Sequence, residues 1–211
     1  VNALIPEFVP YYLDQYLVIA QVFGLTPLIL LNKMDLCQSE SCEAVEYLNY
    51  YRQLGYQTLY VSAIEPESGD GFSRLQKALQ GECSVLMGLS GAGKSSLLNA
   101  LLGEILARTQ SISVANQKGQ HTTTTAQLYH IPSGGDLIDA PGIREFGIEG
   151  LTRAQIFDGY RELEPVLGRC QFRNCLHLQE PGCAVKPLID DLTRFPAFRR
   201  QNLLRMLQDA Q

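Results

Sequence analysis

The chain reads Gly88-Leu89-Ser90-Gly91-Ala92-Gly93-Lys94-Ser95 between an apolar segment, 84–87, and a segment with helical spacing, 94–106. The pattern G-x-x-x-x-G-K-[ST] at a strand-to-helix junction is typical of a phosphate-binding loop, whose backbone N–H groups surround phosphate oxygens. We expect Lys94 to reach the β- and γ-phosphates and to act in catalysis, and Ser95 to ligate Mg²⁺. The residues expected to contact the nucleotide here are Gly88, Ser90, Gly91, Ala92, Gly93, Lys94, Ser95 and Ser96.

Strand-like and helix-like segments alternate around this loop. Apolar strand candidates at 27–31, 58–61 and 84–87 each precede a segment with helical character, at 41–54, 72–80 and 94–106. This rhythm predicts an α/β fold with a mostly parallel, doubly wound sheet. Two further strands are expected at 127–130 and 137–138, and the polar stretch 109–127 is expected to be a mobile loop.

The parallel-sheet rhythm stops after Arg144. Helix-like pieces at about 152–163 and 196–209 flank a compact Cys/His segment at 170–183. We therefore expect two domains, a nucleotide-binding domain over 1–150 and a small, mainly helical, metal-binding subdomain over 151–211.

A second motif, Asn32-Lys33-Met34-Asp35, follows the strand candidate at 27–31. A carboxylate there can accept two parallel hydrogen bonds from the N1–H and the amino group of guanine, whereas adenine has no N1–H and would leave it unsatisfied. Asp35 is thus expected to select guanine, Asn32 to brace the loop and the stem of Lys33 to lie along the base. Ser62 and Ala63, after the next strand, could offer backbone N–H groups to the guanine O6.

The magnesium side of the site is expected near Asp139-Ala140-Pro141-Gly142. Asp139 ends an apolar strand and could hold a Mg²⁺-bound water, and the Gly142 N–H could meet the γ-phosphate. One threonine of the run 122–125, which we assign to Thr124, could complete the Mg²⁺ shell and act in catalysis; a solvated polar loop fits the other three equally well.

The order of these motifs is unusual because the base-selecting elements precede the phosphate loop, the reverse of ordinary GTPases. The site can still form if the sheet is circularly permuted. The sequence here resembles the RsgA (YjeQ-like) family of circularly permuted small-ribosomal-subunit biogenesis GTPases. The motifs that carry the resemblance are Asn32–Leu36, Gly88–Ser96, Gly119–Thr124, Asp139–Gly147, Asn174–His177 and Glu180–Cys183.

The resemblance implies a GTP hydrolase that acts as a ribosome-dependent switch in late maturation of the small (30S) subunit and binds its rRNA. It also implies an N-terminal OB-fold RNA-binding domain, for which this chain has no room, and with no Met at position 1 we expect the chain to be a fragment or a processed form. Ile143 follows D-x-x-G where many GTPases carry a water-orienting Gln, so intrinsic hydrolysis is expected to be slow. His121 is the candidate for that role, although an ordinary loop histidine explains it equally well.

Four metal-ligand types lie close together in the pattern C-x₄-C-x-H-x₅-C, formed by Cys170, Cys175, His177 and Cys183. Three thiolates and one imidazole suit tetrahedral Zn²⁺, which would stabilise a subdomain with little core of its own. The spacing alone is not that of the familiar C-x₂-C sites, and the family resemblance strengthens the assignment. We expect one Zn²⁺ per chain.

The net charge of −5 is unevenly distributed. Up to Ile143 the chain has 13 acidic and 7 basic residues, and after it 9 and 10. The near-neutral part includes a segment that mixes cations and aromatics and could contact RNA or could be an ordinary amphipathic helix. Its residues are Arg194, Phe195, Phe198, Arg199, Arg200 and Arg205.

No apolar run is long enough to cross a bilayer and no secretory signal is recognisable, so we expect a cytoplasmic monomer that binds GTP or GDP, Mg²⁺ and one Zn²⁺. Two other functions remain open at this point. One is a P-loop phosphotransferase with a small-molecule acceptor, and the other is a non-catalytic, GTP-sensing RNA-binding module.

Overall fold

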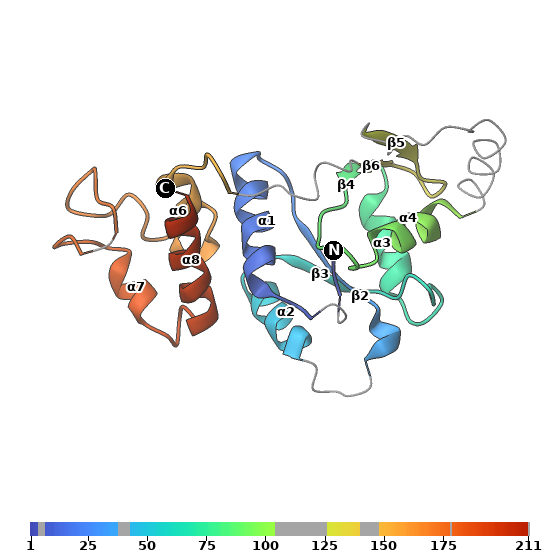
Figure 1. Cartoon of the computed structure of the whole chain (residues 1–211), viewed down its shortest axis with the longest axis horizontal. Coiled ribbons are helices and arrows are strands. Elements are labelled where there is room, and N and C mark those ends of the chain that lie inside the picture. Colours follow the sequence, from blue (N-terminus) through green and yellow to red (C-terminus); the bar gives the residue numbers. More distant parts are fainter. Residues whose placement is uncertain (4–6, 38–42, 104–125, 140–147, 178, 211) are drawn as a thin grey trace. The chain divides into compact units, whose positions relative to one another are not determined.

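The computed structural model describes residues 1–3, 7–37, 43–103, 126–139, 148–177 and 179–210 (Figure 1). The strands are β1 (Asn2–Ala3), β2 (Leu28–Asn32), β3 (Gln57–Tyr60), β4 (Cys83–Val85), β5 (Gln127–His130) and β6 (Asp136–Asp139). The helices are α1 (Pro10–Val22), α2 (Glu43–Gln53), α3 (Gly71–Leu79), α4 (Lys94–Leu102), α6 (Arg153–Asp158), α7 (Lys186–Asp190) and α8 (Ala197–Asp209), with short 3-10 turns η1 (Met34–Leu36) and η3 (Arg161–Leu163).

Contacts divide the chain into two compact units that interleave along the sequence. The nucleotide unit comprises 1–8, 28–52 and 57–146, and the helical unit comprises 9–27, 53–56 and 147–211. Helix α1 thus belongs to the helical unit although the strands on either side of it belong to the nucleotide unit. The two domains expected from the sequence, 1–150 and 151–211, are each one continuous segment, whereas each of these units is made of several segments. The expected boundary near residue 150 stays a prediction.

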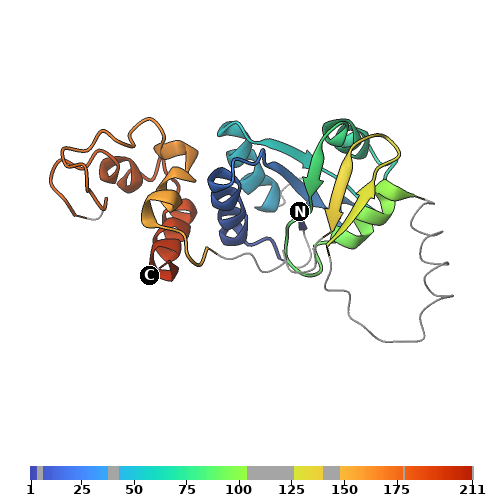
Figure 2. The same cartoon turned by 90° about the horizontal axis from the view of Figure 1, so that it is seen from above.

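The strands of the nucleotide unit form two ladders, β1-β2-β3 and β4-β6-β5. All neighbours are parallel except β5 and β6, which form an antiparallel hairpin (Figure 2). The ladders meet where the Val1 backbone nitrogen donates to the Met87 carbonyl. The expected mostly parallel α/β sheet is confirmed. Among the described strands, the one antiparallel pairing joins β6 to β5, which lies at an edge of its ladder.

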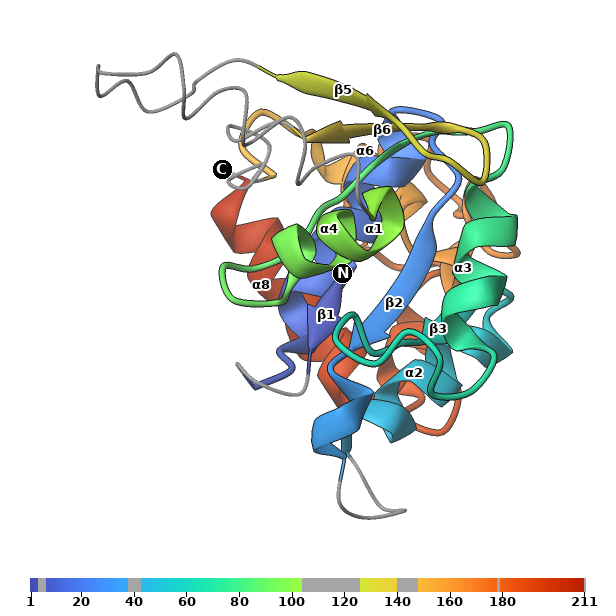
Figure 3. The same ribbon diagram turned by 90° about the vertical axis from the view of Figure 1, so that its right-hand side faces the viewer.

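A leucine-rich core packs α3 and α4 against one face of these strands (Figure 3). Helix α4 contributes buried leucines at spacings of three and four residues, which places them on one side of the helix. The fully buried members include Leu75 of α3, Leu97 of α4 and Leu137 of β6. This core fixes the N-terminus of α4, where the phosphate loop ends.

The helical unit has its own core, built by α1, α6, α7 and α8 around residues such as Tyr160 and Phe195, both 0% exposed. The single helix expected at about 152–163 is divided into α6 and η3, with Gly159 and Tyr160 between them. Helix α6 begins at a capping box, in which the side chains of Thr152 and Gln155 each accept a hydrogen bond from the other's backbone N–H.

A buried ionic network connects α1 to the rest of the helical unit. The Arg199 guanidinium donates to both oxygens of Glu162 at 2.7 and 2.8 Å and also to Asp14, and Asn202 donates to Asp14 at 2.6 Å. Arg199 and Asp14 are 1% and 0% exposed. The guanidinium also lies 4.1 Å from the centre of the Tyr160 ring.

Helices in the described ranges all lack the combination of length and apolar character that a bilayer crossing requires.

Candidate functional site

The base-selecting motif begins at the carboxyl end of β2. Asn32 is the last residue of that strand, and Lys33 has a left-handed backbone with φ of 64° before η1 begins. A non-glycine residue in this conformation reverses the chain direction sharply. The turn brings Asp35 back toward the end of β3, the strand that pairs in parallel with β2.

Asn32 joins the base loop to the two loops beside it. Its side-chain NH₂ donates to the Ala92 carbonyl at 3.1 Å, and its side-chain oxygen accepts from the Ala63 N–H at 3.1 Å. The side chain belongs to a residue only 1% exposed, so loss of either bond would leave a buried polar group without a partner. The structure thus places Asn32 as a brace between the phosphate loop and the 62–63 loop.

Ser62 orients the Asp35 carboxylate. Its hydroxyl donates to one Asp35 oxygen at 2.6 Å and accepts from the Glu65 N–H at 3.2 Å. Sequence reasoning assigned Ser62 only a backbone role toward guanine, and a hydroxyl-to-carboxylate bond between residues 27 positions apart could not be read from the motif.

A cavity of about 220 Å³ that is open to solvent lies among these elements. It is lined by Asn32, Lys33, Asp35, Leu36, Ala63, Ile64, Gly93 and Ser96. Ile64 and Leu36 are 71% and 45% exposed, so their apolar surface is available to contact the flat face of a base. The sequence predicts no contact with the base for either residue, although Leu36 directly follows Asp35 and Ile64 directly follows Ala63.

The phosphate loop needs its glycines for space and for backbone conformation. Gly93 has φ of +87°, and a Cβ there would lie 2.3 Å from the Asn32 amide nitrogen; a Cβ on Gly88 would lie 2.0 Å from the Val1 carbonyl oxygen. The Lys94 ammonium donates to the Gly88 and Leu89 carbonyls at 2.7 Å each. The cation is therefore held over the loop in which phosphate oxygens would sit.

Asp139 is the last residue of β6, which pairs in parallel with β4. The register Val85↔Ile138 puts it beside the start of the segment that leads from β4 into the phosphate loop. Ser95 lies in the first turn of α4, and Ser90, Gly91 and Ser96 lie in or next to the loop. Thr124, His121, Gly142 and Ile143 lie outside the described residues, as does most of the stretch expected to be a mobile loop.

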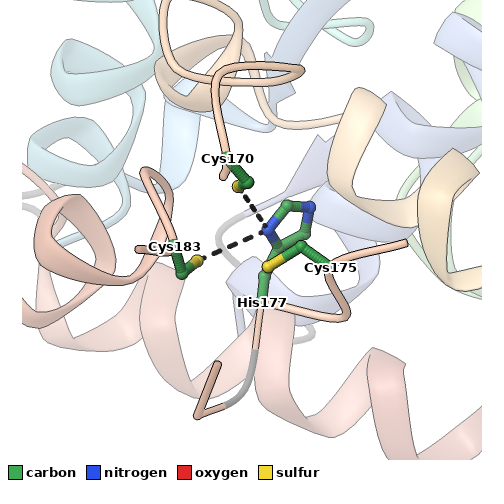
Figure 4. A group of neighbouring side chains, drawn as sticks. All are labelled: Cys170, Cys175, His177 and Cys183. Carbon is green, nitrogen blue, oxygen red and sulfur yellow. Dashed lines mark hydrogen bonds between the residues drawn. The ribbon is translucent and has the colours of Figure 1, made fainter. Parts of the chain in front are cut away.

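The Cys/His segment forms a compact cluster in the helical unit (Figure 4). The ligand atoms of Cys170, Cys175, His177 and Cys183 all lie within 4.8 Å of one another. His177 Nδ1 is 3.4 Å from the Cys170 sulfur and 3.5 Å from the Cys183 sulfur. Three thiols and a ring nitrogen converging on one point fit a tetrahedral Zn²⁺ site.

The surroundings of the cluster orient its ligands. Backbone N–H groups of Ala184 and Lys186 donate to the sulfurs of Cys170 and Cys183, both at 3.3 Å. The Phe157 ring meets the His177 ring edge-on at 4.7 Å between centres. Burial lowers the pKa of His177 against the opposing charge of Glu180, which favours the neutral ring that a metal requires.

The Arg/Phe segment at 194–205 differs from its expected role in RNA contact. Phe195 is 0% exposed within the helical core, and Arg199 is 1% exposed within the ionic network. Arg200 pairs with Asp190 at 3.2 Å, and Arg205 lies over the Tyr11 ring at 3.9 Å. The interpretation as an RNA-facing surface is wrong for Phe195 and Arg199, because helical packing and buried carboxylates account for them.

This chain is similar to several known proteins. A Mannheimia succiniciproducens protein named small ribosomal subunit biogenesis GTPase RsgA is 45% identical over 98% of this chain and 58% of its own length. The chain thus spans a little over half of that relative. The crystal structure of YjeQ from Thermotoga maritima superposes with a TM-score of 0.77 at 31% identity, covering 99% of this chain and 69% of that one.

A second solved structure, YloQ, described as a circularly permuted GTPase, gives a TM-score of 0.71 at 25% identity and covers 99% of this chain and 67% of that one. The family model for the RsgA GTPase matches residues 1–149, which include the base loop, the phosphate loop and Asp139. The chain therefore belongs to the RsgA GTPase family.

Proposed function

We propose that this chain binds and hydrolyses GTP and that the bound nucleotide controls its docking on the small ribosomal subunit during maturation. The observation that carries the proposal is the Asn32 brace. It ties a guanine-type carboxylate motif to the phosphate loop, so base and phosphates are recognised by one connected piece of structure. Relatives named for small-subunit biogenesis support the partner.

In this proposal, Asp35 accepts hydrogen bonds from the guanine N1–H and amino group, and the Lys33 stem and Ile64 flank the base. Lys94 transfers its hydrogen bonds from the Gly88 and Leu89 carbonyls to the β- and γ-phosphates. Ser95 and Asp139 would hold Mg²⁺ together with Thr124, and Gly142 would donate to the γ-phosphate; the ion would neutralise charge that develops on the phosphates. His121 is proposed to position the attacking water.

The metal centre is proposed to hold one Zn²⁺ through Cys170, Cys175, His177 and Cys183, with a structural role. We also propose that the protein is a cytoplasmic monomer before it meets the subunit, and that it contacts rRNA. Metal analysis of protein purified without chelator should give one zinc per chain; a value near zero would contradict the assignment.

The base contact can be tested by exchanging donor and acceptor. Xanthosine triphosphate carries a carbonyl where GTP carries the amino group, so Asp35→Asn should weaken GTP binding by about 10- to 100-fold and improve xanthosine triphosphate binding. Glu65→Gln, a nearby exposed carboxylate outside the cavity, is the matched control and should keep GTP preference. Unchanged preference in Asp35→Asn would refute the assignment.

The activity itself is tested by phosphate release from GTP and ATP, with and without purified small subunits. We expect turnover with GTP only, and a strong rise on addition of small subunits. Stimulation by large subunits alone, or a preference for ATP, would contradict the proposal. Transfer of phosphate to a small molecule would favour a phosphotransferase, and GTP binding with no turnover under any condition would favour a sensing module.

A further inference from the structure

The metal-binding segment presents an exposed aromatic ring to solvent. Phe172, which lies between the ligands Cys170 and Cys175, is 45% exposed. The buried phenylalanines of the same unit, such as Phe157 and Phe195, are at most 2% exposed. The ring of Phe172 is therefore not part of the helical core that holds Phe157 and Phe195.

Cations surround this ring in the sequence. Arg169 and Arg173 are both exposed, and neither has an ion pair with any residue in the described ranges. This distinguishes them from Arg199 and Arg200, whose guanidinium groups are paired with carboxylates. The run 169–176 contains two arginines and no aspartate or glutamate.

The backbone around Phe172 is held on both sides. The Cys175 N–H donates to the Phe172 carbonyl at 3.3 Å, which closes a tight turn, and the Gln171 N–H donates to the Gly182 carbonyl at 3.0 Å. Gly182 has φ of +71°, and a Cβ there would lie 2.5 Å from the Gln171 side chain. The metal ligands on either side of Phe172 converge on one point. Little conformational entropy is then left to lose when a ligand meets the ring.

We propose that Phe172 is a stacking platform for an unpaired base of single-stranded RNA, with Arg169 and Arg173 contacting the phosphates on either side of that base. An exposed aromatic ring next to cations is the combination that binds single-stranded nucleic acid, because every base has a π-face and every linkage carries a negative charge. The inference rests on the proposed role at the small subunit, since it names the part of the chain that would touch RNA.

Charge complementarity favours RNA over a protein partner. Two exposed arginines that flank Phe172 in the sequence, without ion pairs in the described ranges, attract a polyanion, and they would be costly to desolvate in an apolar protein interface. The excess of acidic residues lies before residue 144, so it is not part of the segment that contains Phe172. The platform also differs from the segment at 194–205, where Phe195 is buried in the helical core.

The test uses the full, zinc-containing chain and a single-stranded RNA heptamer with 2-aminopurine at its centre, whose fluorescence is quenched when the base stacks. Wild-type protein should bind and quench. Phe172→Ala and Phe172→Leu should both bind about 10-fold more weakly and lose the quenching, whereas Phe172→Tyr should retain both. Leu192→Ala, which truncates another exposed apolar residue of the same unit at 54% exposure, should behave as wild type.

Charge is tested separately by salt dependence. Arg169→Gln and Arg173→Gln should each reduce the slope of log affinity against log salt by about 0.7, the value for one phosphate contact on a single strand. Zinc content measured on every variant should remain one per chain. Equal affinity and quenching in Phe172→Ala, preference for a duplex of the same sequence, or no binding by the wild type would overturn the inference.

Failure of this inference and failure of the proposed function give different results. If Phe172→Ala binds the heptamer as wild type does and small subunits still stimulate its GTP turnover, only the stacking platform is wrong. If GTP turnover is absent in wild type while Phe172-dependent quenching persists, the hydrolase function is wrong and the RNA contact stands.

Discussion

The base cavity of the nucleotide unit and the Cys/His cluster of the helical unit are held together in different ways. The cavity is braced by hydrogen bonds that the chain makes to itself, through Asn32 and Ser62. The cluster has four converging ligand atoms, but the residues around them are mostly exposed, and few backbone hydrogen bonds cross the segment. The cavity is thus preorganised by the fold, whereas we expect the cluster to depend on the ion that it is proposed to bind.

Removing the metal should produce the largest difference in response between the two regions. Chelation should unfold the 170–183 segment, because a structural Zn²⁺ contributes on the order of 10 kcal/mol in small zinc domains. Trypsin should then cut after Arg169 and Arg173 many times faster, while affinity for a fluorescent GDP analogue changes less than about twofold. A parallel loss of nucleotide binding would show that the cavity is not independent of the cluster.

The buried ionic network offers a second way to perturb only the helical unit. Arg199→Met leaves Asp14 and Glu162 buried without their cation and should lower the free energy of unfolding of that unit by about 3 to 5 kcal/mol. The matched control is Lys186→Met, which removes an exposed pair with Asp190 and should cost less than about 1 kcal/mol. Urea denaturation measures both.

Replacing all three charged residues of the network tests the reason for that loss. Asp14→Leu, Glu162→Leu and Arg199→Met together should recover most of the stability, because no charge then remains buried. Arg199→Met alone being as stable as wild type would show that the network does not hold α1 in place.

The cavity can be perturbed through its own brace. Gly93→Ala forces a side chain into a left-handed backbone and against the Asn32 amide, so affinity for GDP should fall by about 10- to 100-fold. Gly81→Ala is the control with the same sign of φ, at +79°, and nothing within 4 Å. Similar losses in both variants would mean that backbone strain alone, and not displacement of Asn32, is responsible.

The smallest expected effect is on the stability of the helical unit at low pH. A hydrogen bond from Lys186 lowers the pKa of Asp190 below 3.8, with the charges of Lys186 and Arg200 adding to it. The stabilisation is therefore present above the unfolded pKa and is lost as pH falls through the lower folded value. Asp190→Asn should reduce the difference in the free energy of unfolding between pH 7 and pH 3. If the variant shows the same difference as the wild type, Asp190 makes no such contribution.

Most of the nucleotide unit could be predicted from sequence because its signals are local. The strands at 28–32, 57–60 and 83–85 fall within a residue or two of their expected positions, and their polar ends carry the motifs. The contacts that join the motifs could not be predicted from the sequence, and the hydrogen bond between Asn32 and Ala92, 60 residues apart, is an example. The sequence also does not predict that Leu36 and Ile64 line the cavity. The positions of Thr124, His121 and Gly142 stay predictions.

The helical unit was harder to predict because its organisation is long-range. Helix α1 was not anticipated, although Pro10 at its first turn and apolar residues at helical spacing are helix signals. Its buried Asp14 finds its partner 185 residues later at Arg199. Charged residues on a helix normally indicate a solvated face, so sequence alone favoured an exposed role for Arg199 that the fold reverses.

The position of Asn32 also has a consequence for synthesis. The residue is made 31 positions before Ala63 and 60 positions before Ala92, the two main-chain partners of its side chain. At about 5 to 20 residues per second, roughly 3 to 12 s pass between translation of Asn32 and of its last partner. The bond from the Asn32 NH₂ to Ala92 can form only after that interval, so the connection between the end of β2 and the phosphate loop is made after the bond to Ala63 has become possible.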